Sequence, residues 1–291
     1  MKPPVFKYVR VDSIGGALSA LAENRGEAKI LAGGQSLVPM LNFRIASPSV
    51  LVDINPVKEL DYIRVEEGWV RIGARTRQRA LDRSMDVKRK CPLLAEVVKW
   101  IGHPEIRNRG TVGGSLVHAD PTAELALVAI LLDSQVKIQG NRTSRTVGAA
   151  DFFQGIMATS IAEDEILTEV SYPVAPARSG YGFQELCIRH GDFAVVAAAV
   201  QLTVGGNGRC TEARVAVAGA GPTPLRIRGA EEVLVGNNGT DEVFDAAAAR
   251  VPGEVQPFAD LQGSEAYRRE MARVFVRRAL DDAWSRVKEN H

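Results

Sequence analysis

The chain has 291 residues, of which 45% are hydrophobic and 24% are charged, and its 36 basic and 35 acidic residues leave a formal net charge of +1. This near balance, without a basic block, gives no electrostatic case for nucleic acid or an anionic membrane as a partner. No run approaches the roughly 18 to 20 apolar residues of a membrane span, and the start, MKPPVFKYVRV, has no apolar core of signal-peptide length. We therefore expect a soluble cytoplasmic protein with no membrane span.

The first predicted segment, residues 1–57, contains a helix and two short strands. In DSIGGALSALAENRG, Asp12 or Ser13 is the N-cap of the helix and Gly26 ends it. AKILA then reads as a short buried strand that leads into two glycines, and SVLVDI reads as a second strand.

The second segment, residues 58–177, mixes hairpin, helices and strands. LDYIRVEEGWVRIGART predicts a hairpin, and helices are expected from Thr76 and from Cys91 to Trp100. TAELALVAILLDS predicts a strongly apolar helix, while QVKIQG and ILTEVSYPV predict strands.

The third segment, residues 178–291, begins with longer strands and ends with helices. GYGFQELCIRHG, FAVVAAAVQLTV and ARVAVAGAG predict the strands, and helices are expected from about residue 228. The last helix is expected to bury an apolar stripe against the core or another subunit, formed by Tyr267, Met271, Val274, Phe275 and Trp284.

The first glycine-rich turn, AGGQS, has the chemistry of an anion site. Gly33 and Gly34 permit positive φ and close approach of a ligand, and the amides of residues 33 to 37 can converge on a phosphate. Gln35 and Ser36 add side-chain donors, and Leu37 begins the chain beyond them. Taken alone, the same stretch also fits a tight strand-to-helix turn without a ligand.

The second turn, RGTVGGSLVHADPTAE, repeats this chemistry about eighty residues later. Gly110, Gly113 and Gly114 free the backbone, while Thr111 and Ser115 supply hydroxyl groups. Two such turns facing one another would suit a dinucleotide, which carries two phosphates and several hydroxyls. His118 has the chemistry of a base, but we favour a polar loop histidine beside a ligand.

Other sites with recognisable motifs are not supported. There is no G-x-x-x-x-G-K-[ST] phosphate loop and no G-x-S-x-G elbow, and in GAGPTP the prolines at 222 and 224 prevent a following helix. The three cysteines lie far apart with no C-x-x-C pair, whereas an iron–sulfur cluster or a structural zinc site needs about four soft ligands, so we expect no metal in this chain. In RHGDFAVV, Phe193 fits either a ring-covering aromatic or an ordinary core residue.

Four motifs in register resemble the FAD-binding medium subunit of molybdenum hydroxylases, the xanthine dehydrogenase and aerobic carbon monoxide dehydrogenase family. They are AGGQSLVPMLNFR, IRNRGTVGGSLVHADPTAE, DEILTEVSYP and RHGDFAVVAAAV, and the resemblance covers essentially the whole chain. It implies an α+β fold with a two-lobed FAD-binding domain of the vanillyl-alcohol-oxidase type, lobe 1 being residues 1–57 and lobe 2 residues 58–177. Residues 178–291 would form the C-terminal flavoprotein domain, an antiparallel sheet with a helical bundle.

The resemblance also implies cofactor-binding residues. The two diphosphate motifs correspond to Ala32, Gly33, Gly34, Gln35 and Ser36, and to Thr111, Val112, Gly113, Gly114 and Ser115. Asp120 matches an acidic residue near the ribityl chain, and Ile166 and Leu167 match backbone near the isoalloxazine ring. Phe193 stands where some relatives have a tyrosine, so it keeps the stacking surface and loses the hydroxyl.

In such a complex, a large molybdopterin subunit oxidises the substrate and a small subunit with [2Fe-2S] clusters passes the electrons to FAD. The resemblance implies that this chain carries the FAD, passes electrons to an external acceptor, and assembles as a dimer of heterotrimers. Its own duty would be to hold and tune the flavin, without a catalytic side chain.

Two alternatives remain. A self-sufficient flavin-dependent oxidoreductase would need its own substrate site, and it often attaches the flavin covalently through His or Cys. No His or Cys precedes residue 91, so we expect FAD to be bound non-covalently. A scaffold that has lost its flavin is the second alternative, and the intact glycine turns count against it.

Overall fold

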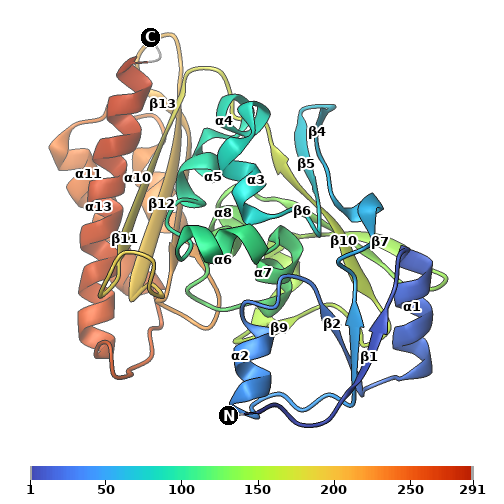
Figure 1. Cartoon of the computed structure of the whole chain (residues 1–291). Coiled ribbons are helices and arrows are strands. Elements are labelled where there is room, and N and C mark those ends of the chain that lie inside the picture. The colour runs from blue at the N-terminus through green and yellow to red at the C-terminus, as the bar shows by residue number, and fades with distance from the viewer. Residues whose placement is uncertain (1, 290–291) are drawn as a thin grey trace.

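A computed structural model describes residues 2–289, which form an α+β fold built on three larger sheets and a two-stranded ribbon (Figure 1). The predicted α+β class is confirmed. No helix within residues 2–289 combines the length and apolarity needed to cross a membrane. The boundaries proposed above at residues 57 and 177 stay a prediction.

The first sheet contains three parallel strands in the order β1-β3-β2. Its elements are β1 (Lys7–Arg10), α1 (Ile14–Glu23), β2 (Ala28–Leu31), α2 (Leu37–Asn42), β3 (Val50–Asp53) and the short 3-10 helix Lys58–Leu60. The side chain of Ser13, not of Asp12, caps α1 by accepting a hydrogen bond from the Gly16 N–H. The sequence analysis missed β1, because its polar alternation gives no buried pattern.

The second sheet is antiparallel and contains five strands in the order β4-β5-β10-β6-β7. The strands are β4 (Ile63–Glu66), β5 (Trp69–Gly73), β6 (Gln135–Gln139), β7 (Ser144–Gly148) and β10 (Ile166–Pro173). The two-stranded ribbon is formed by β8 (Phe153–Gly155) and β9 (Ala158–Thr159). The predicted hairpin and the predicted strands within 135–140 and 166–174 are therefore present.

Short helices cover the second sheet: α3 (Gln78–Arg83), α4 (Met85–Lys90), α5 (Pro92–Val97), α6 (Pro104–Arg109), α7 (Val112–His118), α8 (Glu124–Leu131) and α9 (Ala149–Phe152). Helix α8 is buried along nearly its whole length because it lies between this sheet and the third one. The helix predicted up to Trp100 ends earlier, at Val97, and the Ser84 side chain caps a helix, α4, that the sequence analysis missed.

The third sheet is antiparallel, in the order β11-β12-β13-β14, with strands β11 (Ser179–Leu186), β12 (Val196–Val204), β13 (Cys210–Ala218) and β14 (Leu225–Arg226). Its outer face is covered by α10 (Arg228–Leu234), α11 (Asp241–Ala248), α12 (Val251–Glu254) and the long α13 (Glu265–Glu289), as Figure 1 shows on the left. Its inner face packs against α5 and α8, which belong to the second sheet and its covering helices, called the second part below.

The stripe predicted for the last helix is only partly right. Phe275 is buried, but Tyr267 is 44% exposed. Most of the buried face consists of Ala272, Val276, Ala279, Leu280, Ala283 and Val287, together with Arg268. Small side chains are needed there because α13 lies directly against the glycines of β11.

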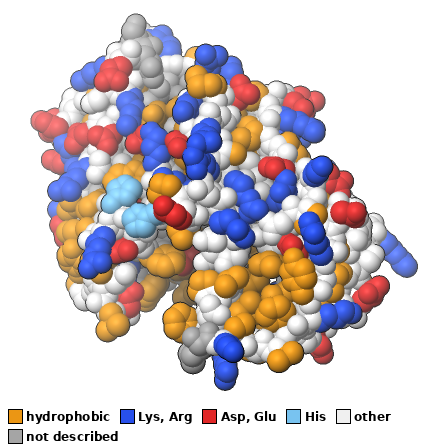
Figure 2. All heavy atoms as spheres, in the orientation of Figure 1, with side chains coloured by type: hydrophobic (Ala, Val, Ile, Leu, Met, Phe, Trp, Pro, Cys, Tyr) orange, Lys and Arg blue, Asp and Glu red, His pale blue; other side chains and the backbone are white. Residues whose placement is uncertain are grey.

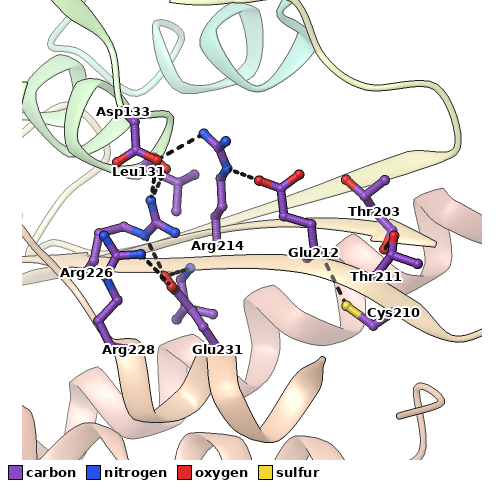
Figure 3. A network of polar contacts seen from close by, with 11 residues as sticks. Leu131, Asp133, Thr203, Cys210, Thr211, Glu212, Arg214, Arg226, Arg228 and Glu231 are labelled. Carbon is purple, nitrogen blue, oxygen red and sulfur yellow. Dashed lines mark hydrogen bonds and ion pairs between the residues drawn. The ribbon is translucent and has the colours of Figure 1, made fainter. Parts of the chain in front are cut away.

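A polar network joins the second part to the third (Figure 3). Arg226 on β14 donates to the carbonyl of Leu131 at 2.9 Å and to Asp133 at 3.0 Å, both at the end of α8. The carboxylate of Glu231 on α10 accepts from Arg226 in turn. These bonds fix the position of α8, whose first turn reaches the candidate site.

Candidate functional site

A cavity of about 550 Å³ opens between the first sheet, the second part and the loop after β11. This volume lies within the roughly 300–1,000 Å³ of typical ligand pockets. Figure 2 shows apolar side chains gathered over β2 and α2, on the lower right of the molecule. All of the predicted site residues except Val112 line the cavity: Ala32, Gly33, Gly34, Gln35, Ser36, Leu37, Gly110, Thr111, Gly113, Gly114, Ser115, Asp120, Ile166, Leu167 and Phe193.

Val112 lies in the core and not on the cavity wall. Its side chain has no exposed surface, and its N–H donates to the carbonyl of Thr76 at 2.9 Å. Val112 begins α7 and its side chain points into the core, so a contact between this side chain and a ligand is not supported.

The first glycine turn presents unused backbone donors. β2 ends at Leu31, and Gly34 adopts a φ of 72°, which turns the chain sharply. Within residues 2–289, the N–H groups of residues 33–37 make no hydrogen bond to a protein acceptor. The side-chain amide of Gln35 donates to the carbonyl of Gly33 at 3.0 Å and holds the turn in shape. Such a row of free N–H groups is suited to an anion.

The second turn is different, because its own fold uses most of its backbone donors. Gly113 donates to the carbonyl of Ala74 at 2.8 Å, and Gly114 donates to the side-chain oxygen of Thr111 at 3.1 Å. The second turn can therefore offer a ligand the hydroxyl groups of Thr111 and Ser115, and the glycines provide a surface without side chains. The two turns therefore have complementary roles and are not equivalent.

The two turns touch. A Cβ atom on Gly33 would lie 2.5 Å from the carbonyl oxygen of Arg109 and 2.9 Å from the Cα of Gly110. Only glycine permits this approach, which brings residues about eighty positions apart against each other.

Asn55 and Arg77 fix this arrangement. The side-chain amide of Asn55 donates to the carbonyl of Ala32 at 2.9 Å, and its oxygen accepts from Arg77. Arg77 also donates to the carbonyl of Arg109. A continuous chain of hydrogen bonds therefore runs from the first turn to the second. The sequence analysis missed both residues, since neither belongs to a glycine motif.

The remaining predicted residues come from three segments. Asp120 accepts hydrogen bonds from the N–H and the hydroxyl of Thr122, at 2.8 and 2.7 Å, in the loop between α7 and α8. Ile166 and Leu167 begin β10, and both side chains are buried. Phe193 lies in the loop before β12 and is 67% exposed, so the alternative of an ordinary core residue is wrong.

Two acidic residues on the wall were not predicted. Glu165 lies just before β10, and its carboxylate accepts from Arg145 at 2.7 and 3.1 Å, which holds the pKa of Glu165 below its usual value. Glu124 begins α8, and burial raises its pKa to about 7. His118 also lines the cavity, at the end of α7. Both carboxylates fall within the quoted motifs, Glu124 at the end of RGTVGGSLVHADPTAE and Glu165 in DEILTEVSYP, but the sequence gives neither of them a role.

The donor set fits a dinucleotide better than a metal. Free N–H groups, hydroxyls and glycine surfaces meet where the two turns touch, and apolar residues such as Met40 and Ile54 line the first-sheet side. No group of three or more His, Cys, Asp or Glu side chains within the described part of the chain could hold a metal ion.

Two family models match the chain. The FAD binding domain in molybdopterin dehydrogenase matches residues 4–175, and the CO dehydrogenase flavoprotein C-terminal domain matches residues 181–283.

Several proteins resemble the chain over its whole length. It is 42% identical to the 6-hydroxypseudooxynicotine dehydrogenase complex subunit alpha of Paenarthrobacter nicotinovorans, over 99% of this chain and 97% of that protein. It is 37% identical to the carbon monoxide dehydrogenase medium chain of Hydrogenophaga pseudoflava, over 98% and 99%.

Solved structures show the same likeness. A chain of the carbon monoxide dehydrogenase from Hydrogenophaga pseudoflava superposes with a TM-score of 0.95 at 38% identity, covering 98% of this chain and 99% of that chain. A chain of quinoline 2-oxidoreductase from Pseudomonas putida 86 gives a TM-score of 0.93 at 34% identity, with coverage of 98% and 99%.

Proposed function

Since this chain belongs to the family of FAD-binding medium subunits of molybdenum hydroxylase complexes, we propose that it relays electrons from iron–sulfur clusters to an external acceptor. It is an oxidoreductase subunit whose cofactor is FAD. The observation that carries the proposal is the set of free N–H groups at residues 33–37, which lie against the second glycine turn inside one large cavity.

In this proposal the first turn binds the FAD diphosphate through the backbone N–H groups of Gly33 to Leu37. Thr111 and Ser115 add hydroxyl donors from the second turn, and Gly110, Gly113 and Gly114 let the ligand approach the backbone. Asp120 lies where it can accept from a hydroxyl of the ribityl chain. When bound, FAD supplies two-electron redox chemistry that no side chain of this protein provides.

We place the flavin ring at the end of the cavity formed by Leu167, Glu124 and Phe193. Phe193 supports this placement because its ring is exposed and lies on the loop that closes this end. Of the exposed apolar side chains, Ile106 and Val117 line the cavity, whereas Ile188, just after β11, would be covered by a partner.

The proposed partners are a large molybdopterin subunit and a small subunit with [2Fe-2S] clusters, assembled as a dimer of heterotrimers in the cytoplasm. The names of the relatives support the existence of partners, since they describe a medium chain, a medium subunit and a subunit of a complex. The molybdenum and iron–sulfur centres would belong to those partners.

The test begins with the isolated chain. We expect it to purify yellow, with FAD that is released unmodified on denaturation. Carbon monoxide, glyceraldehyde and nicotinate, the substrates named for relatives, should not reduce the bound FAD, because the substrate site is on another subunit. The complex isolated with its natural partners should reduce its FAD with its own substrate.

Other outcomes separate the alternatives. Reduction of the isolated chain by one of these substrates would contradict the relay and support a self-sufficient oxidoreductase. A colourless chain that also fails to bind added FAD would contradict the FAD site itself and support a scaffold.

A further inference from the structure

Two carboxyl groups near one end of the cavity have no ion-pair partner among the described residues. Glu124 begins α8 and lines the cavity. Glu185 lies near the end of β11 and is only 8% exposed. No ion pair within residues 2–289 involves either residue. Buried carboxylates without a partner are costly, so the pair calls for a functional explanation.

The strand geometry directs Glu185 toward the cavity side. Successive side chains of a strand point to opposite faces, so Glu185 shares a face with Phe183. Phe183 packs in the core that contains α5 and α8, whereas Gln184 points the other way and donates to Asp282 of α13. Both carboxyl oxygens of Glu185 are buried without a hydrogen bond among the described residues, although the Cys187 thiol lies beside them.

Within residues 2–289, no positively charged side chain acts on the pair. β12, β13 and α5 face it with apolar side chains: Ala197, Ala199, Ala216, Ala218, Leu93, Leu94 and Val97. The titratable groups nearest to it are Asp120 before α8, and Cys187 and Asp192 after β11. His118 and Lys29 also line the cavity, but neither acts on the two carboxyls.

The electrostatic consequence is that the pair retains a proton at neutral pH. Burial, and to a lesser extent the charge of Asp120, raises the pKa of Glu124 to about 7. Burial and then the charge of Glu124 raise the pKa of Glu185 to about 8. Because two like charges in one apolar region repel, the two carboxyls titrate together and stay partly protonated.

We propose that the Glu124–Glu185 pair is a proton-binding site that takes up a proton from water when the flavin in the cavity is reduced. The inference rests on the proposed function, because it requires FAD in the cavity with its ring at this end. Two electrons from the iron–sulfur donor, or from a chemical reductant, and one proton go to the flavin, which is left with one additional negative charge. The second proton goes to a carboxylate of the pair and offsets that charge. Glu124 lines the cavity at the proposed position of the ring, and Glu185 would act through Glu124 as a positioning residue.

The direction of the effect follows from charge. A negative charge added to the flavin raises the pKa of both carboxyls, so the pair gains a proton between its pKa in the oxidised protein and its higher pKa in the reduced protein. Well below pH 7 both carboxyls are already protonated and no uptake occurs. Above about pH 7 the reduction potential should therefore fall more steeply with pH than in a protein that lacks the pair.

The experiment is a spectroelectrochemical titration of the FAD-loaded full-length chain from pH 6 to pH 9. The variants are Glu185→Gln and the double variant Glu124→Gln/Glu185→Gln. The matched control is Glu232→Gln, which removes an exposed carboxylate on α10, away from the cavity. The wild type and the control should show a steeper dependence than the double variant above pH 7, by up to tenfold in the reduction equilibrium per pH unit, or about 30 mV for two electrons. Glu185→Gln should shift this region to lower pH, because it removes the carboxyl with the higher pKa, about 8, and leaves Glu124, whose pKa is about 7.

Infrared difference spectra between oxidised and reduced protein provide a second measurement. Proton uptake by the pair adds a carboxylic acid C=O band on reduction, and Glu185→Gln should weaken or shift that band. The proposal is overturned if wild type and double variant show the same pH dependence, or if Glu185→Gln leaves the infrared bands unchanged. If the double variant no longer binds FAD, the pH dependence and infrared bands of Glu185→Gln test the proposal, since Glu185 does not line the cavity. A wild-type chain that binds no FAD would contradict the proposed function instead.

Discussion

Gly33 is the residue on which the two glycine turns meet. Its missing side chain allows the first turn to rest on the backbone of Arg109 and Gly110, and its N–H is one of the free donors. We expect Gly33→Ala to force the turns apart, to destabilise the protein by about 1–3 kcal/mol, and to weaken FAD binding at least tenfold. Urea denaturation and fluorescence titration with FAD measure the two effects.

Gly15→Ala is the matched control for this substitution. Nothing lies within 4 Å of a Cβ at Gly15, which is in α1, and alanine is favoured over glycine in helices by about 1 kcal/mol. This variant should bind FAD like the wild type and be at least as stable. Equal FAD affinity in Gly33→Ala and Gly15→Ala would contradict the role assigned to the first turn.

Sequence patterns identify residues whose chemistry is local. Gly33, Gly34 and Thr111 can be recognised in the sequence, because a glycine pair with a neighbouring hydroxyl forms a motif of only five or six residues. Asn55 and Glu185 cannot be recognised in this way. Asn55 acts through hydrogen bonds to residues 23 and 22 positions away, and the role of Glu185 depends on which face of β11 its side chain occupies. Tertiary structure decides which isolated polar residues reach the cavity.

At the scale of elements, the packing of α13 on β11 shows the same limit. Gly180 and Gly182 bring the strand against the helix, and a Cβ on Gly182 would lie 1.9 Å from the carbonyl oxygen of Ala279. The close contact selects alanines for the buried face. A prediction based on large apolar residues therefore included Tyr267, which is exposed.

This contact predicts a large effect from a single methyl group. Gly182→Ala should destabilise the protein by about 3 kcal/mol or more, because neither the strand nor the helix backbone can move without disturbing the sheet. Gly206→Ala, in the turn between β12 and β13, is the control, since its nearest neighbour would be the Arg178 side chain at an ordinary 3.6 Å. Chemical denaturation of both variants checks the prediction, and similar losses of stability would contradict the packing argument.

At the scale of the whole molecule, the buried apolar residues of the described part of the chain form three clusters of unequal size. The largest joins the second part to the inner face of the third sheet, and a second lies under α13. The first sheet has only a small cluster, around Val52, Leu18 and Leu60, and it reaches the second part through Ile166. A small core gives little independent stability, so the first sheet should depend most on a ligand that bridges the cavity.

The difference in size between the three apolar clusters predicts which part of the chain FAD stabilises most. Binding to the native state alone contributes about 2.7 kcal/mol when free FAD is 100 times its Kd. Hydrogen exchange should be fast in β1, β2 and β3 of the FAD-free chain and slow markedly on FAD addition, while β12 and β13 change little, because they lie between two large clusters. Gly33→Ala should lose most of this protection at the same FAD concentration. Uniform protection across all three sheets would contradict the argument, since the ligand would then act on global unfolding and not on the seating of the first sheet.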